Sequence, residues 1–208
     1  MHLEYLLPLL AILGMACAST PQQASPSPRP LIGFAIRDQE RARDRQRQEI
    51  RTPGPEHRLL DSLSGDFRAT IRYWAREGEP PSTSTATSSN AWIAGGRFVS
   101  CQLRGEIAGQ PWERCSILGY DRGRTAYVET RVDSLTTEMP GIAVGHTEGD
   151  EGAIVFTRTI DDPVLGQSVH LREQLTIEGW RSHRFEQWID PPGGQPYQML
   201  EIRYERIR

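Results

Sequence analysis

The stretch "NAWIAGGRFVSC", Asn90 to Cys101, decides the fold because it places two adjacent glycines between segments that both have the composition of strands. Tight hairpin turns of the primed types need positive φ at their central residues, and glycine adopts such angles without steric cost. Gly95-Gly96 therefore predicts a turn that sets Trp92 opposite Val99. The alternative, a glycine-rich phosphate cradle, needs a helix after the glycines, and Arg97–Leu103 does not have a helical pattern.

A second hairpin is predicted directly after the first. The segments "RFVSCQLRGEI" and "PWERCSILGYD" flank a turn near Ala108-Gly109, at similar distances from Cys101 and Cys115. A simple register sets these two cysteines opposite each other, close enough for a disulfide, which an oxidising compartment would favour. A register shift of one residue would instead place the two thiols on opposite faces of the sheet.

The region before these hairpins changes its hydrophobic period. Pro55 and Glu56 suit the first turn of a short helix that runs to Leu63. His57 is interpreted as a capping group, and an acid–base pair with Glu56 is the alternative. From Phe67 to Tyr73 apolar and polar residues alternate, which indicates a strand with one buried face. A short helix is therefore expected to lead into the first strand.

The rest of the chain continues as strands separated by turn residues. The strand-like segments are "TAYVETRVDSLTT", "GAIVFTRTI", "QSVHLREQLTIE", "RSHRFEQWI" and "YQMLEIRYERI". Together with the earlier segments they give about nine or ten strands at short spacing, which predicts one antiparallel barrel or sandwich. Residues 54–208 are long enough to bury the core of a single domain.

The first residues have the pattern of an export signal. Residues 1–18 contain an apolar run from Leu6 to Ala16, too short for a permanent membrane span, that ends in small residues. Cys17 is then a lipidation site that anchors the protein to a membrane, and cleavage after Ala18 to give a free periplasmic protein is the alternative. Residues 19–53, rich in Pro and Ser and then in mixed charges, predict a disordered, solvated linker.

Composition excludes several classes of function. The net charge is -3 and the chain contains no lysine, so we expect no nucleic-acid partner. Motifs for phosphate loops, dinucleotides, nucleophilic serines or zinc do not occur. We predict no metal site and no cofactor. A histidine-ligated heme is a remaining alternative, but the last strand offers it no histidine.

Several motifs, in order, resemble a family of bacterial domains of unknown function with a lipocalin-like (calycin) barrel. They are "GPEHRLLDSLSGDF", "AWIAGGRF", "LGYDRGRTAYVETRVDSLTT", "DPVLG", "FEQW" and "MLEIRYER". The resemblance implies an all-β fold: a single antiparallel up-and-down barrel whose short N-terminal helix closes one end. It also implies that Arg206 of the last strand packs on Phe67, a cation over an aromatic face. The family often has Trp at the position of Phe67.

Polar residues in the last strands are the candidates for ligand binding. Arg172, Glu186 and Glu201 stand at matching places of the family pattern, and alternation gives Glu186 the face of Trp188 and Glu201 that of Met199. If this face points inward, the barrel has an apolar pocket with charges for the polar end of a ligand. If it points to solvent, the charges form ordinary cross-strand pairs.

Three functions follow from these expectations. The first is an exported, periplasmic or membrane-anchored protein that binds a small apolar or amphipathic molecule in the barrel. The second is an enzyme that uses Glu186, Glu201 or His183 for acid–base chemistry in the same cavity. The third is an envelope interaction protein with a filled barrel, which acts through its surface.

Overall fold

Ten β-strands form the folded domain. The computed structural model describes residues 32–139, 141–149, 152–162 and 166–207. The elements are an α-helix, α1 (Ile32–Arg51), a 3₁₀ helix, η1 (Pro55–Leu63), and the strands β1 (Gly65–Tyr73), β2 (Ser82–Ile93), β3 (Phe98–Ile107), β4 (Gln110–Asp121), β5 (Ala126–Asp133), β6 (Ala143–Glu148), β7 (Ala153–Asp162), β8 (Gln167–Ile177), β9 (Ser182–Asp190) and β10 (Tyr197–Arg206).

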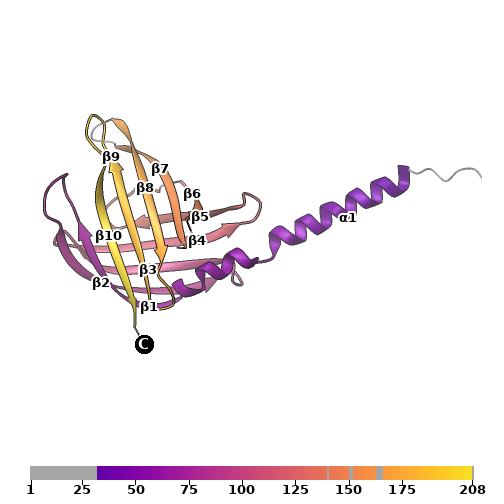
Figure 1. The fold of residues 1–208 in the computed structure, drawn as a ribbon, viewed down its shortest axis with the longest axis horizontal. Helices are drawn as coiled ribbons and strands as arrows, with labels where there is room; N and C mark the ends of the chain where they lie inside the picture. The colour runs from indigo at the N-terminus through magenta and orange to yellow at the C-terminus, as the bar shows by residue number, and fades with distance from the viewer. Residues whose placement is uncertain (1–31, 140, 150–151, 163–165, 208) are drawn as a thin grey trace, which may run out of the picture. The chain divides into compact units, whose positions relative to one another are not determined.

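The strands close into an antiparallel up-and-down barrel (Figure 1). Each strand pairs with the next one along the chain, and β1 closes the ring by pairing with β10, which sets Phe67 opposite Arg206. The length of the ladders varies around the ring, and β5 and β6 pair over only three residues each, Tyr127–Glu129 and Ala143–Gly145. The predicted fold class is confirmed.

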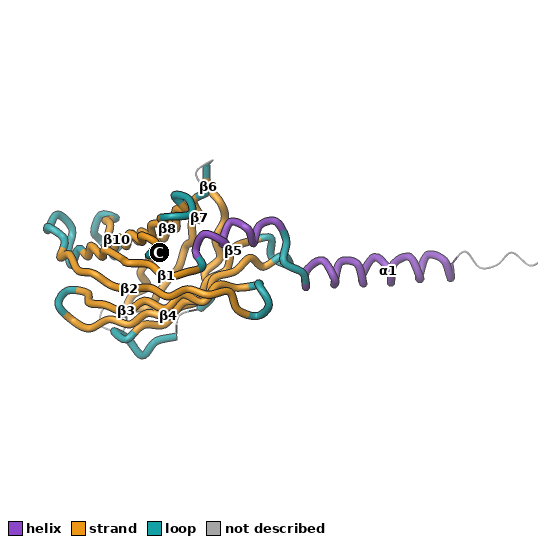
Figure 2. Tube along the Cα trace, turned by 90° about the horizontal axis from the view of Figure 1, so that it is seen from below, coloured by secondary structure: helices purple, strands orange, loops and turns teal. Residues whose placement is uncertain are grey.

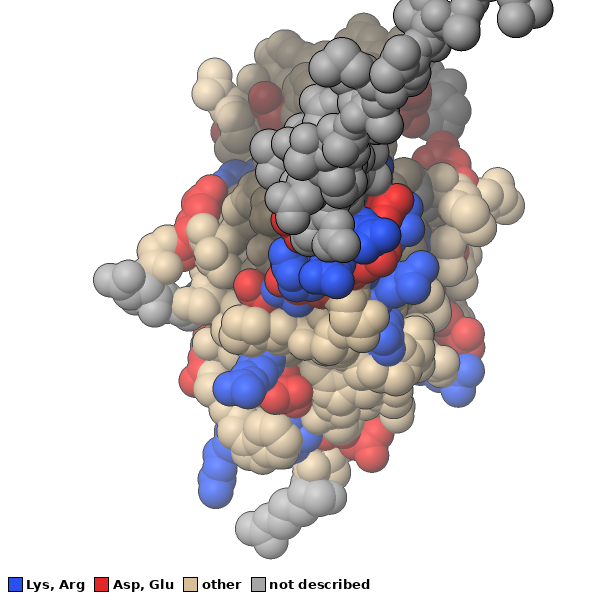
Figure 3. Space-filling view, turned by 90° about the vertical axis from the view of Figure 1, so that its right-hand side faces the viewer, with Lys and Arg blue, Asp and Glu red and all other residues tan. Residues whose placement is uncertain are grey.

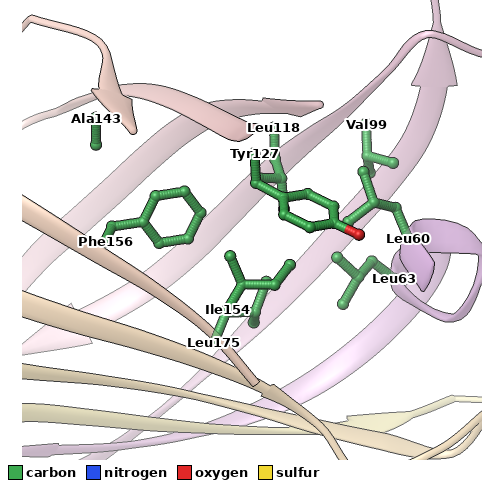
Figure 4. Packing of buried hydrophobic residues seen from close by; sticks show 9 residues of the cluster. All are labelled: Leu60, Leu63, Val99, Leu118, Tyr127, Ala143, Ile154, Phe156 and Leu175. Carbon is green, nitrogen blue, oxygen red and sulfur yellow. The ribbon is translucent and has the colours of Figure 1, made fainter. Parts of the chain in front are cut away.

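The helix η1 closes one end of the barrel (Figure 2). Its Leu60 and Leu63 are almost fully buried and belong to an apolar cluster that several strands complete (Figure 4). At its start, Nδ1 of His57 accepts a hydrogen bond from the Gly54 N–H at 3.1 Å, which is the predicted capping role. The sequence predicted an ordinary helix here, and the structure has the tighter 3₁₀ form.

The chain divides at Glu40–Arg41 into two units, and the barrel belongs to the second. The stretch Arg37–Arg51, part of the linker expected to be disordered and solvated, is helical in α1, and its side chains are exposed. Among the described helices, none is long and apolar enough to cross a membrane. Cys17 and the expected signal lie outside the described residues. Arginines and acidic side chains are interspersed on the face shown in Figure 3, and do not form a basic stripe there.

The hairpin at the two glycines forms with the predicted register, because Trp92 lies opposite Val99. Its turn is longer than predicted. The residues Ala94, Gly95 and Gly96 all have positive φ, and the strands resume at the pair of Ile93 with Phe98. Glycine therefore stands where the backbone needs it.

The predicted disulfide is wrong, because the register of the second hairpin differs by one residue. The turn consists of Ala108 and Gly109 only, so Ile107 pairs with Gln110 and, farther along the ladder, Cys101 pairs with Ser116. Cys115 lies opposite Gln102 instead. The two side chains therefore lie on opposite faces of the sheet, with Cys101 inside the barrel, and both are free thiols.

Arg206 joins the end of the last strand to the end of η1. Its guanidinium lies 4.7 Å from the centroid of the Phe67 ring, the position that the resemblance implied, and 4.0 Å from that of Trp180. It also donates hydrogen bonds to the carbonyl oxygens of Ser62 and Ser64, both at 2.7 Å, and of Trp180 at 2.8 Å. Three carbonyls and two aromatic rings thus hold one planar cation.

Replacing Arg206 by Lys is expected to destabilise the barrel by about 2 kcal/mol, because an ammonium cannot reproduce this planar set of charged hydrogen bonds. Urea unfolding at pH 7 measures the change. Arg203→Lys is the control, because Arg203 is more exposed and bonds only to Glu201 among the described residues. Equal stability of Arg206→Lys and wild type would contradict the role of the planar group.

Candidate functional site

The predicted ligand-binding residues do not line the barrel interior. Arg172 lies between the buried residues Leu171 and Glu173, so its side chain points outward, and Trp188 stands opposite it on β9. Glu186 and Glu201 are opposite each other on the same outer face, with buried residues on both sides of each. Met199 lies at an irregularity of β10 between Gln198 and Leu200 and is half-buried.

The charges on this outer face pair with neighbouring arginines, both across strands, as the alternative interpretation of the sequence held, and along the same strand. Glu201 bonds to Arg203 at 3.1 Å and to Arg72 at 3.5 Å. Glu186 lies 3.2 Å from Arg184. Burial acts to raise the pKa of Glu201, but the two arginines outweigh it and the pKa is lowered. Glu201 therefore stays ionised and is unsuited to donate a proton.

Charged residues that the sequence analysis did not select occupy the interior. We call them the interior ion cluster, and its members come from β4, β5, β7 and β8: Arg114, Glu129, Arg131, Arg158 and Glu173. None of their side chains is more than 10% exposed, and Glu173 is 0% exposed. Burial of charge on this scale is costly unless the charges pair.

The pairing within the interior ion cluster is uneven. Arg158 is well held: it lies 2.5 Å from Glu129, 3.0 Å from Glu173, and 3.1 Å from the carbonyl oxygen of Gly141. Arg131 bonds to Glu173 through Nη2, but its Nη1 makes no hydrogen bond with the described residues. Arg114 has the weakest pairing, 3.6 Å from Glu129. Arg114 and Arg131 both lie over the Phe185 ring.

Three arginines and two glutamates leave the interior ion cluster with one surplus positive charge. Burial acts to raise the pKa of Glu129, but Arg131, Arg114 and Arg158 outweigh it and the pKa is lowered. Burial, and then the nearby Arg131, lower the pKa of Arg114, although a guanidinium still keeps its proton at neutral pH. The surplus therefore rests mainly on Arg114.

A cavity of about 60 Å³ adjoins Arg114, between the cluster at η1 and a second apolar cluster that includes Leu103 and Phe185. Its lining combines apolar side chains with polar groups from most of the strands: Ser88, Asn90, Cys101, Arg114, Ser116, Glu129, His183 and Tyr204. Within the described part of the barrel, side chains of the two apolar clusters and the interior ion cluster leave this small polar chamber between them.

His183 and Cys101 contribute neutral groups to the cavity wall. His183 lies between two rings, stacked on Tyr204 at 4.3 Å and edge-on to Phe67 at 4.7 Å between centroids. Burial, and then Arg206, lower the pKa of His183 to about 3, so its ring is neutral at pH 7. Burial raises the pKa of the Cys101 thiol to about 12, so it is not a ready nucleophile.

A signal in the sequence could have located the interior ion cluster. In "VHLREQLTI", Glu173 has the phase of Leu171 and Leu175, and in "AYVET" Glu129 has the phase of Tyr127. A charge in phase with the apolar residues of a strand predicts a buried charge. Metal binding has no such support: among the described residues, no group of three or more His, Cys, Asp or Glu is placed to hold an ion.

Exposed apolar side chains concentrate in one part of the chain. Of the nine large ones among the described residues, five lie between residues 132 and 144: Val132, Leu135, Met139, Ile142 and Val144. Both this concentration and the nearly filled interior are features that an interaction protein would have.

The profile of a family described as "Protein of unknown function (DUF1579)" matches residues 52–206, which includes every strand of the barrel. The chain belongs to this family. The DUF1579 match begins just before η1, so it covers the barrel together with the helix that closes it. A search of the curated proteins finds no match.

Solved structures similar to this DUF1579 barrel are themselves distant in sequence. Rv2717c from M. tuberculosis is 14% identical, with a TM-score of 0.52 over 76% of this chain and 100% of that one. A redesigned beta barrel, b11L5F_LGL, is 14% identical with a TM-score of 0.37, over 73% and 96% of the two chains. At this identity Rv2717c shows a shared fold and nothing about activity.

Proposed function

We propose that this DUF1579 protein binds a short-chain organic carboxylate in its central cavity, with the carboxylate group against Arg114. The observation that carries the proposal is the surplus positive charge of the interior ion cluster beside that cavity. A buried charge is stabilised by a partner of opposite sign, and a carboxylate matches the planar fork of a guanidinium. A bound anion would bring the formal charge of the interior to zero.

The size and lining of the cavity limit the ligand. A water molecule needs about 10–15 Å³ of such volume, so a chamber of about 60 Å³ accommodates on the order of four or five non-hydrogen atoms. Leu63, Leu118 and Leu175 supply an apolar wall. These features support a ligand the size of acetate or propionate, with its carbon chain against the leucines.

Binding fits the cavity better than catalysis does. Glu129 is held ionised by three arginines, and the neutral His183 is a very weak base. Glu186 and Glu201, two of the three acid–base candidates considered from the sequence, lie on the outer face. General acid–base catalysis favours groups whose pKa lies near the working pH. The expected signal and the lipid anchor at Cys17 would place this binding site outside the cytoplasm.

Thermal unfolding with and without acetate tests the proposal. Acetate is expected to raise the Tm of the wild type relative to sodium chloride at equal ionic strength, while acetamide, a neutral isostere, leaves it unchanged. A ligand at 100 times its Kd stabilises the folded state by about 2.7 kcal/mol. Arg114→Gln is expected to abolish the acetate shift, since it removes the positive charge that the two glutamates of the interior ion cluster do not balance.

Arg104→Gln is the matched control, because Arg104 lies on the outer face of β3 and is 69% exposed. It is expected to keep the acetate shift of the wild type. Equal shifts from acetate and acetamide, or equal loss in the two variants, would contradict the site. If neither acetate nor propionate raises the Tm, interaction through the exposed apolar side chains between residues 132 and 144 becomes the better-supported function.

A further inference from the structure

A second pocket lies on the outer face of the barrel, separate from the central cavity. It has a volume of about 650 Å³, and β7, β8, β9 and Pro196 form its walls. Two side chains that the sequence analysis selected, Arg172 and Trp188, line it. Of the two placements that the sequence left open, both take the solvent-facing one, and both belong to a pocket of the size that small-molecule sites have.

Two rows of side chains cross this outer pocket. The first row is Thr157, Arg172 and Trp188, and the second is Thr159, His170 and Asp190, with each row in register across three strands. Residues in register share a face and lie next to each other. The two rows therefore present one aromatic ring, one cation, one carboxylate, one imidazole and two hydroxyl groups on a single surface.

The contacts within the rows fix the side chains that a ligand would meet. The Arg172 guanidinium lies 5.1 Å from the centroid of the Trp188 ring and 3.5 Å from the Glu148 carboxylate. In the second row, Thr159 Oγ1 and His170 Nδ1 are 3.1 Å apart, a hydrogen bond whose direction depends on the tautomer. Glu148 and Asp190 offset the charge of Arg172, so the pocket does not select for anions.

We propose that this outer pocket binds a neutral saccharide, with the apolar face of a pyranose ring against Trp188. An indole offers a broad apolar surface. Hydroxyl groups at the rim of a sugar ring both donate and accept hydrogen bonds, and the second row supplies acceptors and donors in Asp190, His170 and Thr159. A purely apolar ligand would leave these polar groups unpaired, and an anion would meet Asp190.

Saturation-transfer NMR with a panel of disaccharides tests the proposal. The panel is maltose, cellobiose, lactose and N,N′-diacetylchitobiose, each at millimolar concentration, with glycerol as the polyol that lacks a ring. Wild type is expected to transfer saturation to the ring protons of at least one sugar and not to glycerol. Trp188→Ala is expected to weaken that binding about tenfold or more, and Asp190→Ala to weaken it as well.

Trp74→Ala is the matched control, because Trp74 is also half-buried and also carries an arginine over its ring, Arg72 at 4.9 Å. It lies just after β1, outside the outer pocket, and is expected to bind the sugar as the wild type does. Failure of all four sugars to bind overturns the proposal, as does binding that Trp188→Ala leaves unchanged. Neither result bears on the acetate experiment, which reports on the central cavity.

Discussion

Replacing Glu173 by Gln is expected to lower the free energy of unfolding by about 3–5 kcal/mol, because it removes one partner from a buried group of charges. Glu173 is 0% exposed and pairs with both Arg131 and Arg158. The variant keeps the shape of the side chain but leaves three buried arginines with a single carboxylate. Such a loss is a large fraction of the stability of an ordinary domain.

Urea unfolding at neutral pH measures this effect, with Glu113→Gln as the matched control. Glu113 pairs with Arg104 at 3.6 Å on the outer face, where both side chains are 69% exposed. Exposed pairs of this kind contribute about 0–1 kcal/mol. Both variants remove one negative charge paired with arginine, so the difference between them reports the burial of Glu173 together with its second arginine partner. A loss below about 1 kcal/mol in Glu173→Gln would contradict a charge-paired interior.

The barrel is expected to lose stability as the pH falls below 6.5, and His183 is the main cause. Its pKa is about 3 in the folded state and 6.5 for an ordinary histidine. Below pH 6.5 this histidine becomes protonated in the unfolded chain but stays neutral in the folded chain, so protonation favours unfolding. The expected slope approaches about 1.4 kcal/mol per pH unit, and the loss at pH 3 is on the order of 4 kcal/mol.

His183→Phe is expected to flatten this dependence between pH 6.5 and pH 5, since a third aromatic ring replaces the imidazole between Phe67 and Tyr204. Urea unfolding at a series of pH values measures the slope. A shallower slope remains, because burial also lowers the pKa of His57. The carboxylates with lowered pKa, Glu129 and Glu201, lose their contribution only at lower pH. An unchanged slope in His183→Phe would show that His183 has the same pKa in the folded and unfolded protein, which contradicts the role of burial.

The fold was predictable because each strand carries its period in its own sequence. Alternation from Phe67 to Tyr73 and the glycine pair after Ile93 both act locally, and both predicted the structure. Register was harder to predict, since it depends on the length of a turn. Because the turn consists of only two residues, Ala108 and Gly109, Cys101 pairs with Ser116 and not with Cys115. Spacing in the sequence brings the two cysteines near each other but does not decide which face each one takes.

The candidate site was not predictable from the residue types alone. On β9, Glu186 and Trp188 lie on the same face, and the large apolar side chain of Trp188 predicts that this face points inward. The buried residues of the strand are instead His183, Phe185 and Gln187. The general trend that apolar residues lie inside therefore predicts the wrong face for this strand. The polar residues His183 and Gln187 point into the barrel, and Trp188 points outward. The phase of Glu129 and Glu173 in their strands indicates that they are buried, but only the pairing across strands shows which arginines they meet.

The uneven ladders of the ring have a consequence for exchange with solvent. Only three residues of β5 pair with β6, whereas the ladder of β7 and β8 runs over ten residues on each strand. Local opening of the barrel wall costs the least free energy where the fewest backbone hydrogen bonds must break. Glu129, at the edge of this short ladder, also lines the central cavity. We therefore expect the proposed ligand of the chamber to enter where β5 separates from β6.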